Sequence, residues 1–425
     1  MLDLVLTTNL VLLVKGPAEL SIHGQASIME KDISDSKLLL EEGKLFPIET
    51  NSSCRISLSL SMHEQENKYQ GNFWVYSHRE AGTKIWEDVI QLIFCAMRTV
   101  PESILVTGPT DAGKTTLSTC IINQAINRGL KPAIIDADVG QGDLAPPTAI
   151  GCGIVESQIV DLRDVPTKYF EFVGNTNPSG YRRLISRLVR RLFNRLKKRK
   201  GDSSKVNMIV INTDGYVTGD GLSGKIAIAN KIKPDVIICL GENTSNLCFQ
   251  IETKLWSEKI PILLNANSPP TAYPILKSRQ ERERRRLDQF QRFITDFGIS
   301  GKAKSFSLEK IKIVYKGLTY YKILVTRNND LILLGKNRTK KIMYRCFVNM
   351  FVGLGRADSL VGFGIISKLA KHTITIHTGV RVLDKIYLSN TGINRHTWKP
   401  YTIDNIVRPR YVARSRYFGT DRHEP

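Results

Sequence analysis

The residues with the clearest chemistry form the run GPTDAGKTT, from Gly108 to Thr116. The run fits the pattern G-x-x-x-x-G-K-[ST], in which glycines let backbone N–H groups approach phosphate oxygens and a lysine neutralises them. We expect Lys114 to contact the outer phosphates of a nucleotide and Thr115 to offer its hydroxyl to Mg²⁺. An ordinary Gly-rich turn is the structural alternative. The predicted phosphate cradle consists of Gly108, Pro109, Thr110, Asp111, Ala112, Gly113, Lys114, Thr115 and Thr116.

Two carboxylates follow in the run KPAIIDADVGQG, residues 131–142. In proteins with such a cradle, an acid after the second strand orients Mg²⁺ or the attacking group. We expect Asp138, which precedes Gly140 and Gly142, to take this role, whereas the alternative for Asp136 is a turn or cap residue. These motifs alone leave the phosphoryl acceptor open, because water, a small molecule or a polymer would all suit them.

The elements that must position these residues alternate between strand and helix. Apolar runs followed by helical patterns predict a parallel sheet that helices cover on both faces. The cradle joins one such strand to the helical run LSTCIINQAINRG, which is the context that the motif requires. The predicted strands are SILVTG, KPAIIDADV, VNMIVINTDG, DVIICLGE and PILLNAN.

The flanking segments have a different pattern. Residues 1–88 contain short β-branched runs broken by Gly, Pro, Asn and Asp, and β-rich runs return after residue 300. Helical periodicity begins in IWEDVIQLIFCAM. The sequence therefore predicts an α/β fold with a central P-loop domain at 89–300, a smaller amino-terminal β domain at 1–88 and a carboxy-terminal β-rich domain at 301–425.

Composition restricts the class of protein and its partners. A hydrophobic content of 42% and a charged content of 24% exclude a disordered chain and a coiled rod. The net charge of +21 favours nucleic acid as a partner, with an anionic membrane surface second and a basic surface without such a ligand as the bland alternative. One helical run, RRLISRLVRRLFNRLKKRK at 182–200, is basic and amphipathic, so it either faces RNA phosphates or a membrane, or packs on the sheet with a solvated basic back.

Cysteine usage and the amino terminus indicate a location. The seven cysteines are scattered without a Cys-x-x-Cys pair, and we expect buried thiols in a reducing intracellular compartment, the cytoplasm or, in a eukaryote, the nucleus. The apolar start MLDLVLTTNLVLLVKG lacks a basic beginning and a cleavage site and is too short to cross a bilayer. We interpret it as a first pair of β-strands.

Four segments together resemble one family. DADVGQG following GPTDAGKTT resembles the Clp/Grc/Nol family of polynucleotide 5′-hydroxyl kinases, which act in tRNA, mRNA and rRNA processing. FVGNTNPSGY resembles that family's substrate clasp, and INTDGYVTGDG resembles the segment whose aromatic residue stacks on a base. KSRQERERRR resembles the mobile lid, although Lys277 stands where we expect a third arginine. The substrate-binding residues that the resemblance implies are Gln141, Thr176, Asn177, Pro178 and Tyr216.

The resemblance implies an activity and its parts. The expected reaction moves the γ-phosphoryl of ATP, or of GTP or another triphosphate, with Mg²⁺, to the 5′-hydroxyl of RNA, with DNA as a second substrate. The expected partners are RNA and the subunits of an RNA-processing complex, and no membrane. The residues implied as catalytic are Lys114, Asp138, Arg282 and Arg286, and those implied at the metal are Thr115 and Asp138.

Three alternatives stay open at this point. One is an inactive ATP-binding scaffold of a processing complex, against which the intact cradle, Asp138 and lid arginines argue. Another is an NTPase that uses water as acceptor, which phosphate release without RNA would reveal. The third is a deviant-Walker ATPase, which the absence of an additional lysine between Pro109 and Ala112 disfavours.

Overall fold

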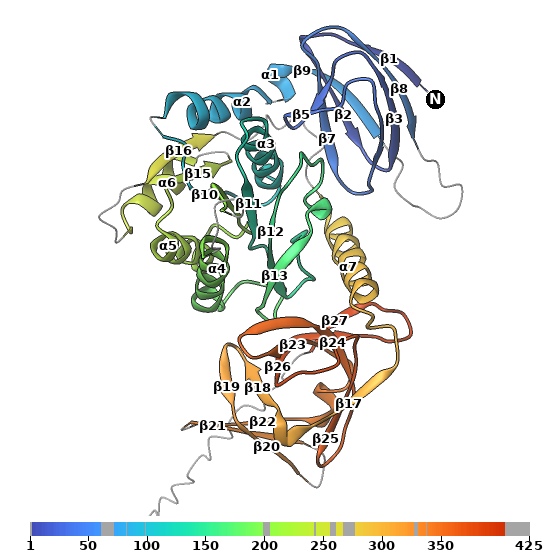
Figure 1. Cartoon of the computed structure of the whole chain (residues 1–425), viewed down its shortest axis with the longest axis vertical. Coiled ribbons are helices and arrows are strands. Elements are labelled where there is room, and N and C mark those ends of the chain that lie inside the picture. The colour runs from blue at the N-terminus through green and yellow to red at the C-terminus, as the bar shows by residue number, and fades with distance from the viewer. Residues whose placement is uncertain are drawn as a thin grey trace, which may run out of the picture.

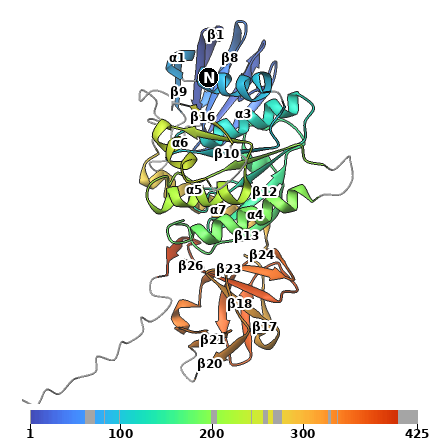
Figure 2. The same cartoon turned by 90° about the vertical axis from the view of Figure 1, so that its left-hand side faces the viewer.

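The computed structural model describes residues 2–60, 72–81, 83–97, 99–198, 205–241, 244–255, 261–266, 277–326, 330–336 and 338–403. Three bodies follow one another along the long axis of the molecule, with the amino terminus at one end (Figure 1; Figure 2). In the described residues, no helix is both long enough and apolar enough to span a membrane.

The central body contains a seven-stranded sheet in the order β13-β12-β11-β14-β10-β15-β16. Strands β11, β14, β10, β15 and β16 run parallel to one another, and each corresponds to a strand predicted from the sequence. The P-loop α/β fold is therefore confirmed. The bounds are β10 Ser103–Thr107, β11 Pro132–Asp136, β12 Ala149–Ile154, β13 Thr167–Phe172, β14 Met208–Asn212, β15 Val236–Leu240 and β16 Ile262–Ala266.

Alternate residues of these strands belong to two cores, one on each face of the sheet. Ile104 and Val106 pack with α2 and α3, whereas Leu105 packs with α4, α5 and α6 on the opposite face. This burial on both faces explains why the strands are continuously apolar. The helices are α1 His78–Ala81, α2 Thr83–Gln91, α3 Lys114–Asn127, α4 Arg182–Lys197, α5 Asp220–Ile232, α6 Thr244–Glu252 and α7 Arg279–Asp296.

The expectation of a wholly parallel sheet is wrong at one edge. β12 and β13 were not predicted; β12 pairs antiparallel with β11, and β13 pairs antiparallel with β12. In β12, a Cβ atom on Gly151 would lie 2.6 Å from the Leu144 carbonyl oxygen, and one on Gly153 would lie 2.6 Å from Val165 Cγ1. Close backbone approach thus requires glycines in this strand, and glycines weaken the β pattern of a sequence.

The amino-terminal body consists of two antiparallel sheets that face each other across one core. The first has the order β1-β8-β3-β6, and the second has the order β5-β4-β7-β2-β9. The strands are β1 Leu2–Leu6, β2 Leu10–Lys15, β3 Ala18–His23, β4 Ser27–Ile28, β5 Lys31–Asp32, β6 Lys37–Leu40, β7 Leu45–Glu49, β8 Cys54–Leu60 and β9 Asn72–Ser77.

The carboxy-terminal body is also β-rich and packs against β13 and α7 through aromatic rings. Phe363 of β24 lies edge-on to Phe170 of β13, with ring centroids 5.4 Å apart. Its two sheets have the orders β17-β25-β24-β23-β26-β18-β19, with β27 beside β26, and β20-β21-β22. The strands are β17 Ala303–Ser307, β18 Lys312–Tyr315, β19 Leu318–Tyr320, β20 Lys322–Val325, β21 Leu331–Gly335, β22 Arg338–Ile342, β23 Met350–Arg356, β24 Ser359–Leu369, β25 Thr373–His377, β26 Lys385–Ile393 and β27 Pro400–Thr402.

Candidate nucleotide and phosphoryl-acceptor site

The predicted cradle links the end of β10 to the start of α3. Gly108 has no room for a side chain, because a Cβ atom there would lie 2.0 Å from the carbonyl oxygen of Leu240. Gly113 has a φ of 84°, which favours glycine, and α3 begins at the next residue. The loop therefore presents backbone N–H groups and a helix amino terminus to one point, an arrangement that binds anions.

Lys114 is the buried cation of this loop. Its side chain is only 8% exposed, and Nζ donates a hydrogen bond of 2.6 Å to the carbonyl oxygen of Pro109. Burial lowers the pKa of this ammonium to about 8, although Asp138 partly opposes the shift. A buried ammonium with a lowered pKa gains stability from an anionic ligand.

A cleft of about 350 Å³ opens in front of the loop. Three parts of the chain contribute to its walls: the cradle, the β2 and β7 strands of the amino-terminal body, and the start of α7. Gly108, Pro109 and Ala112 belong to the loop but do not line the cleft. The cradle residues that line it are Thr110, Asp111, Gly113, Lys114, Thr115 and Thr116.

The two predicted carboxylates differ in environment. Asp138 lines the cleft, and its Oδ1 accepts hydrogen bonds of 2.9 Å from the backbone N–H groups of Gly140 and Gln141. Asp136 lies deeper, and burial, together with the charges of Asp143 and Asp138, raises the pKa of its carboxyl to about 7. Of the two carboxylates, Asp138 is the one that faces the open cleft.

Oxygen atoms suited to a hard cation lie beside the cradle. The Nδ2 of Asn212 lies 3.3 Å from both Thr115 Oγ1 and Asp136 Oδ1, and Asn212 Oδ1 is buried without a partner among the described residues. Hydroxyl, carboxylate and amide oxygens are the ligands that Mg²⁺ takes. Thr115, Asp136 and Asp138 therefore fit a magnesium ion, and Asp136 extends the pair expected from the sequence. Asn212 faces two of these residues with its amide nitrogen, so it positions them and is not itself a ligand.

Four of the five residues expected at the substrate line the same cleft: Gln141, Thr176, Pro178 and Tyr216. Asn177 is exposed and is not among the described residues of the cleft wall. Its Oδ1 accepts a 2.9 Å hydrogen bond from the Ser179 N–H, while its own N–H donates to Asn175 Oδ1. The side chain of Asn177 thus shapes the turn that carries its neighbours.

The predicted lid is the beginning of α7, where Ser278 caps the helix and exchanges hydrogen bonds with Glu281. Arg286 lines the cleft. Arg282 instead contacts the cradle, with its Nη2 2.7 Å from Asp111 Oδ2. Lys277 lines the cleft too, and burial lowers its pKa to about 8, with the nearby Arg285 acting in the same direction.

Sequence reasoning missed a buried charge network beside the cleft. Arg285 of α7 donates to Asp143 at 2.9 Å, and Lys44 of the amino-terminal body pairs with Asp143 at 3.2 Å and also with Asp161. Burial would raise the pKa of Asp143, but Lys44 and Arg285 hold it well below its usual range. The sequence positions of these charged residues did not indicate the network, because its members are separated by up to 241 residues.

The sequence analysis also did not identify the residues that form an apolar wall of the cleft. It combines side chains of β2, β7, α2 and the loop before the short helix Leu162–Asp164. Such a wall suits a flat, weakly polar group next to the phosphate cradle. Its members are Leu13, Met29, Leu45, Phe46, Pro47, Trp86, Val160 and Leu162.

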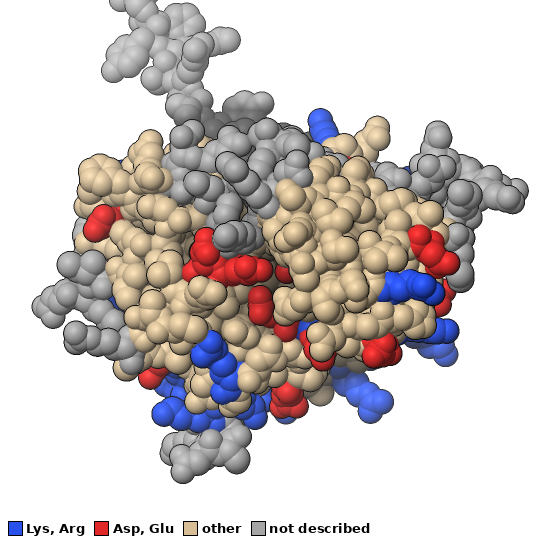
Figure 3. Space-filling model, turned by 90° about the horizontal axis from the view of Figure 1, so that it is seen from above, with Lys and Arg blue, Asp and Glu red and all other residues tan. Residues whose placement is uncertain are grey.

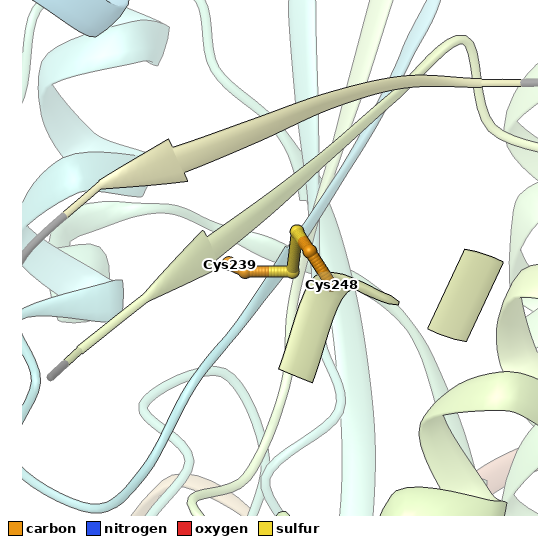
Figure 4. Close-up of a disulfide and its surroundings, with 2 residues drawn as sticks. All are labelled: Cys239 and Cys248. Carbon is orange, nitrogen blue, oxygen red and sulfur yellow. A yellow bond between two sulfur atoms is a disulfide. The ribbon is translucent and has the colours of Figure 1, made fainter. Parts of the chain in front are cut away.

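The expectation of seven free buried thiols is wrong. Cys239 at the end of β15 and Cys248 of α6 form a disulfide (Figure 4). Cys95 is exposed, whereas Cys54, Cys120, Cys152 and Cys346 are buried thiols. Cys248 follows Cys239 by nine positions in the sequence, and their Cα atoms lie 5.9 Å apart.

Comparison with known proteins identifies relatives of this chain. Residues 108–296 match the family model described as the P-loop of the mRNA cleavage and polyadenylation factor CLP1. A polyribonucleotide 5′-hydroxyl-kinase of Methanocaldococcus jannaschii is 28% identical over 317 residues, which cover 68% of this chain and 84% of the relative.

A second sequence relative and a solved structure are consistent with these matches. A polyribonucleotide 5′-hydroxyl-kinase of Pyrococcus furiosus is 30% identical over 216 residues, 50% of this chain and 55% of the relative. The solved structure of a wild-type Clp1p–Pcf11p complex matches with a TM-score of 0.64 at 12% identity, covering 92% of this chain and 97% of that one. At that identity the structural match supports the fold alone.

Proposed function

This chain belongs to the Clp1 P-loop family, and on that premise we propose that it is an ATP-dependent polynucleotide 5′-hydroxyl kinase acting on RNA. One observation carries the proposal. A single cleft combines the phosphate cradle around Lys114, the carboxylate of Asp138, the aromatic side chain of Tyr216 and the basic start of α7. An enzyme that transfers a phosphoryl group from a triphosphate to a polymer end needs these four parts within reach of one another.

The nucleotide side of the cleft has two chemically distinct ends. We propose that the phosphates of ATP lie against the backbone of Gly113–Thr116 and the ammonium of Lys114. The base then lies against the apolar wall, where Phe46 and Trp86 offer aromatic surface. GTP or another triphosphate is the alternative donor. Mg²⁺ bound by Thr115, Asp136 and Asp138 would neutralise charge on the phosphate oxygens.

We propose that the acceptor side of the cleft binds the 5′ end of RNA. Thr176, Pro178 and Gln141 hold the terminal nucleotide, Asn177 shapes the turn of this clasp, and Tyr216 stacks on a base. Single-stranded DNA is a second candidate acceptor. Subunits of an RNA-processing complex are candidate partners.

The reaction needs one proton acceptor and several cations. The 5′ oxygen forms a bond to the γ-phosphorus while the bond from that phosphorus to the bridging oxygen breaks, and ADP leaves. The carboxylate of Asp138 orients the hydroxyl and takes its proton. Lys114, Arg282 and Arg286 stabilise the charge that spreads over the transferring group. For Arg282 this requires release from Asp111, which it contacts at 2.7 Å.

The experiment that separates this proposal from its rivals measures phosphate release and RNA labelling side by side. A kinase labels 5′-hydroxyl RNA and releases little phosphate, whereas an NTPase releases phosphate at the same rate with 5′-phosphorylated RNA. A scaffold binds ATP and does neither. Arg282→Ala should lower turnover about 10²-fold or more with ATP affinity nearly unchanged, and unchanged turnover would reject the role of Arg282.

A further inference from the structure

Three exposed cations lie at the junction between the central and carboxy-terminal bodies, and we name them the basic strip: Arg183, Arg187 and Lys316. Arg183 and Arg187 are one helical turn apart on α4, the helix beside the carboxy-terminal body (Figure 2). Lys316 stands in the turn between β18 and β19. The strip is therefore shared by two bodies of the molecule.

Contacts hold the two parts of the strip together. A Cβ atom on Gly317 would lie 2.6 Å from Arg187 Nη2 and 2.8 Å from Leu184 Cδ1, so the β18–β19 turn rests on α4. The Lys316 ammonium lies 5.6 Å from the ring centre of Tyr181, the residue that precedes α4. The three cations thus follow one continuous surface.

The other cations of α4 are already bound to protein groups. Arg182 pairs with Asp220 at 2.9 Å, Lys197 with Glu102 at 3.1 Å, and Arg191 with Glu171. Arg190 donates to the Lys231 carbonyl oxygen and Arg195 to that of Asp358. In the described part of the chain, the three residues of the strip form no ion pair with an acid. Their charge is therefore available to an anion.

The strip begins where the cleft ends. A second, smaller hollow shares Pro178, Asp214 and Tyr216 with the cleft wall and continues to Arg182, the first residue of α4. Tyr181, which precedes Arg182 in the chain, contacts Lys316 of the strip. By contrast, Figure 3 shows that the amino-terminal end of the molecule has a mostly uncharged surface with acidic residues in a central hollow.

We propose that RNA downstream of its first nucleotides leaves the cleft past Tyr216 and runs along the basic strip, with its phosphates against Arg183, Arg187 and Lys316. The inference rests on the proposed function, because it takes the cleft to hold the 5′ end. Cations that follow an aromatic platform suit single-stranded nucleic acid without base-specific contacts. The carboxy-terminal body thereby contributes directly to substrate binding.

Equilibrium binding tests the strip without any need for catalysis. The triple variant Arg183→Ala/Arg187→Ala/Lys316→Ala is compared with wild type by fluorescence anisotropy on a 5′-hydroxyl RNA of about 20 nucleotides and on a trinucleotide. The matched control is Lys37→Ala/Arg55→Ala/Lys371→Ala, which removes three exposed cations elsewhere on the surface. The unfolding midpoint of each variant shows that it remains folded.

The strip makes a quantitative prediction. Losing three phosphate contacts should reduce the slope of log K against log salt by about 2, so raising salt from about 50 to about 200 mM weakens wild type roughly 16-fold more than the variant. Affinity for the long RNA should fall at least about fivefold, affinity for the trinucleotide should not change, and the variant Arg183→Lys/Arg187→Lys should keep much of the wild-type affinity. An unchanged affinity or salt slope of the triple variant for the long RNA would overturn the proposal and would point to an acidic protein as the ligand of the strip. An equal loss of affinity in the control variant would also overturn it.

Kinetics keep this inference separate from the proposed function. If wild type phosphorylates RNA, the triple variant should raise KM for the long RNA and leave kcat and the trinucleotide KM unchanged. A rise in the trinucleotide KM as well would contradict the strip as a downstream site. If wild type transfers no phosphate, the kinase proposal fails, and the long-RNA binding and its salt slope still decide whether the strip exists.

Discussion

At the scale of single residues, the cleft contains two lysines whose ammonium groups are destabilised before any ligand binds. Burial lowers the pKa of both Lys114 and Lys277 to about 8. A phosphate group placed beside them favours the charged form and raises both pKa values. Nucleotide binding and proton binding are therefore linked.

The sign of this linkage gives a prediction. At about pH 8.5 the free protein has largely lost these two protons, so ATP binding should be accompanied by proton uptake, which should vanish near pH 6.5, where both lysines are already charged. Calorimetry in buffers of different ionisation enthalpy measures the number of protons. Lys114→Ala and Lys277→Ala should each reduce the uptake at high pH; uptake that neither variant alters would rule out these lysines as its source.

Asp138 combines a structural and a chemical role that two substitutions separate. Asn at this position keeps an oxygen to accept the hydrogen bonds from Gly140 and Gln141 but has no negative charge. Asp138→Asn should therefore lower kcat for RNA phosphorylation about 10²-fold or more, while stability changes by less than about 1 kcal/mol. Asp138→Ala should lower both kcat and stability, because alanine has neither the charge nor the hydrogen-bonding oxygen. Wild-type kcat in Asp138→Asn would exclude the carboxylate as base.

At the scale of elements, what the sequence could predict depended on whether the signal was local. The cradle is one continuous run between a strand and a helix, so its pattern already contained the geometry around Lys114. β12 escaped prediction because its glycines serve packing rather than strand propensity. The pairing of Arg282 with Asp111, rather than with the open cleft, depends on how α7 docks, which no local pattern specifies.

The docking of α7 rests on buried charge, and this gives a prediction about stability. Asp143 is 2% exposed and pairs with Lys44 and Arg285. Asp143→Ala removes the acid that pairs with Arg285 and one of the two acids that pair with Lys44, and it should destabilise the protein by about 3–5 kcal/mol. Urea unfolding followed by fluorescence measures the loss. The control is Glu283→Ala on the exposed face of α7, which breaks only its pair with Arg279 and should cost less than about 0.5 kcal/mol; equal costs would refute a special role for the network.

At the scale of the whole molecule, the site exists only because the bodies meet. The apolar wall comes from β2, β7 and α2, the cradle from the central sheet, and Lys277, Arg285 and Arg286 from the segment that leads to the carboxy-terminal body. The three-part organisation could be expected from the change of pattern along the chain. The network of Lys44, Asp143 and Arg285 could not, because a single sequence contains no information on which distant charges become neighbours.

The most direct test of the kinase proposal is transfer of labelled γ-phosphate from ATP to single-stranded RNA with a free 5′-hydroxyl. Matched DNA and a 5′-phosphorylated RNA serve as comparison acceptors, and wild type is compared with Lys114→Ala. A 5′-hydroxyl kinase should place label on the hydroxyl end of RNA and none on the phosphorylated control, and Lys114→Ala should lose the labelling. Measurable ATP binding by wild type without any labelled RNA would contradict it.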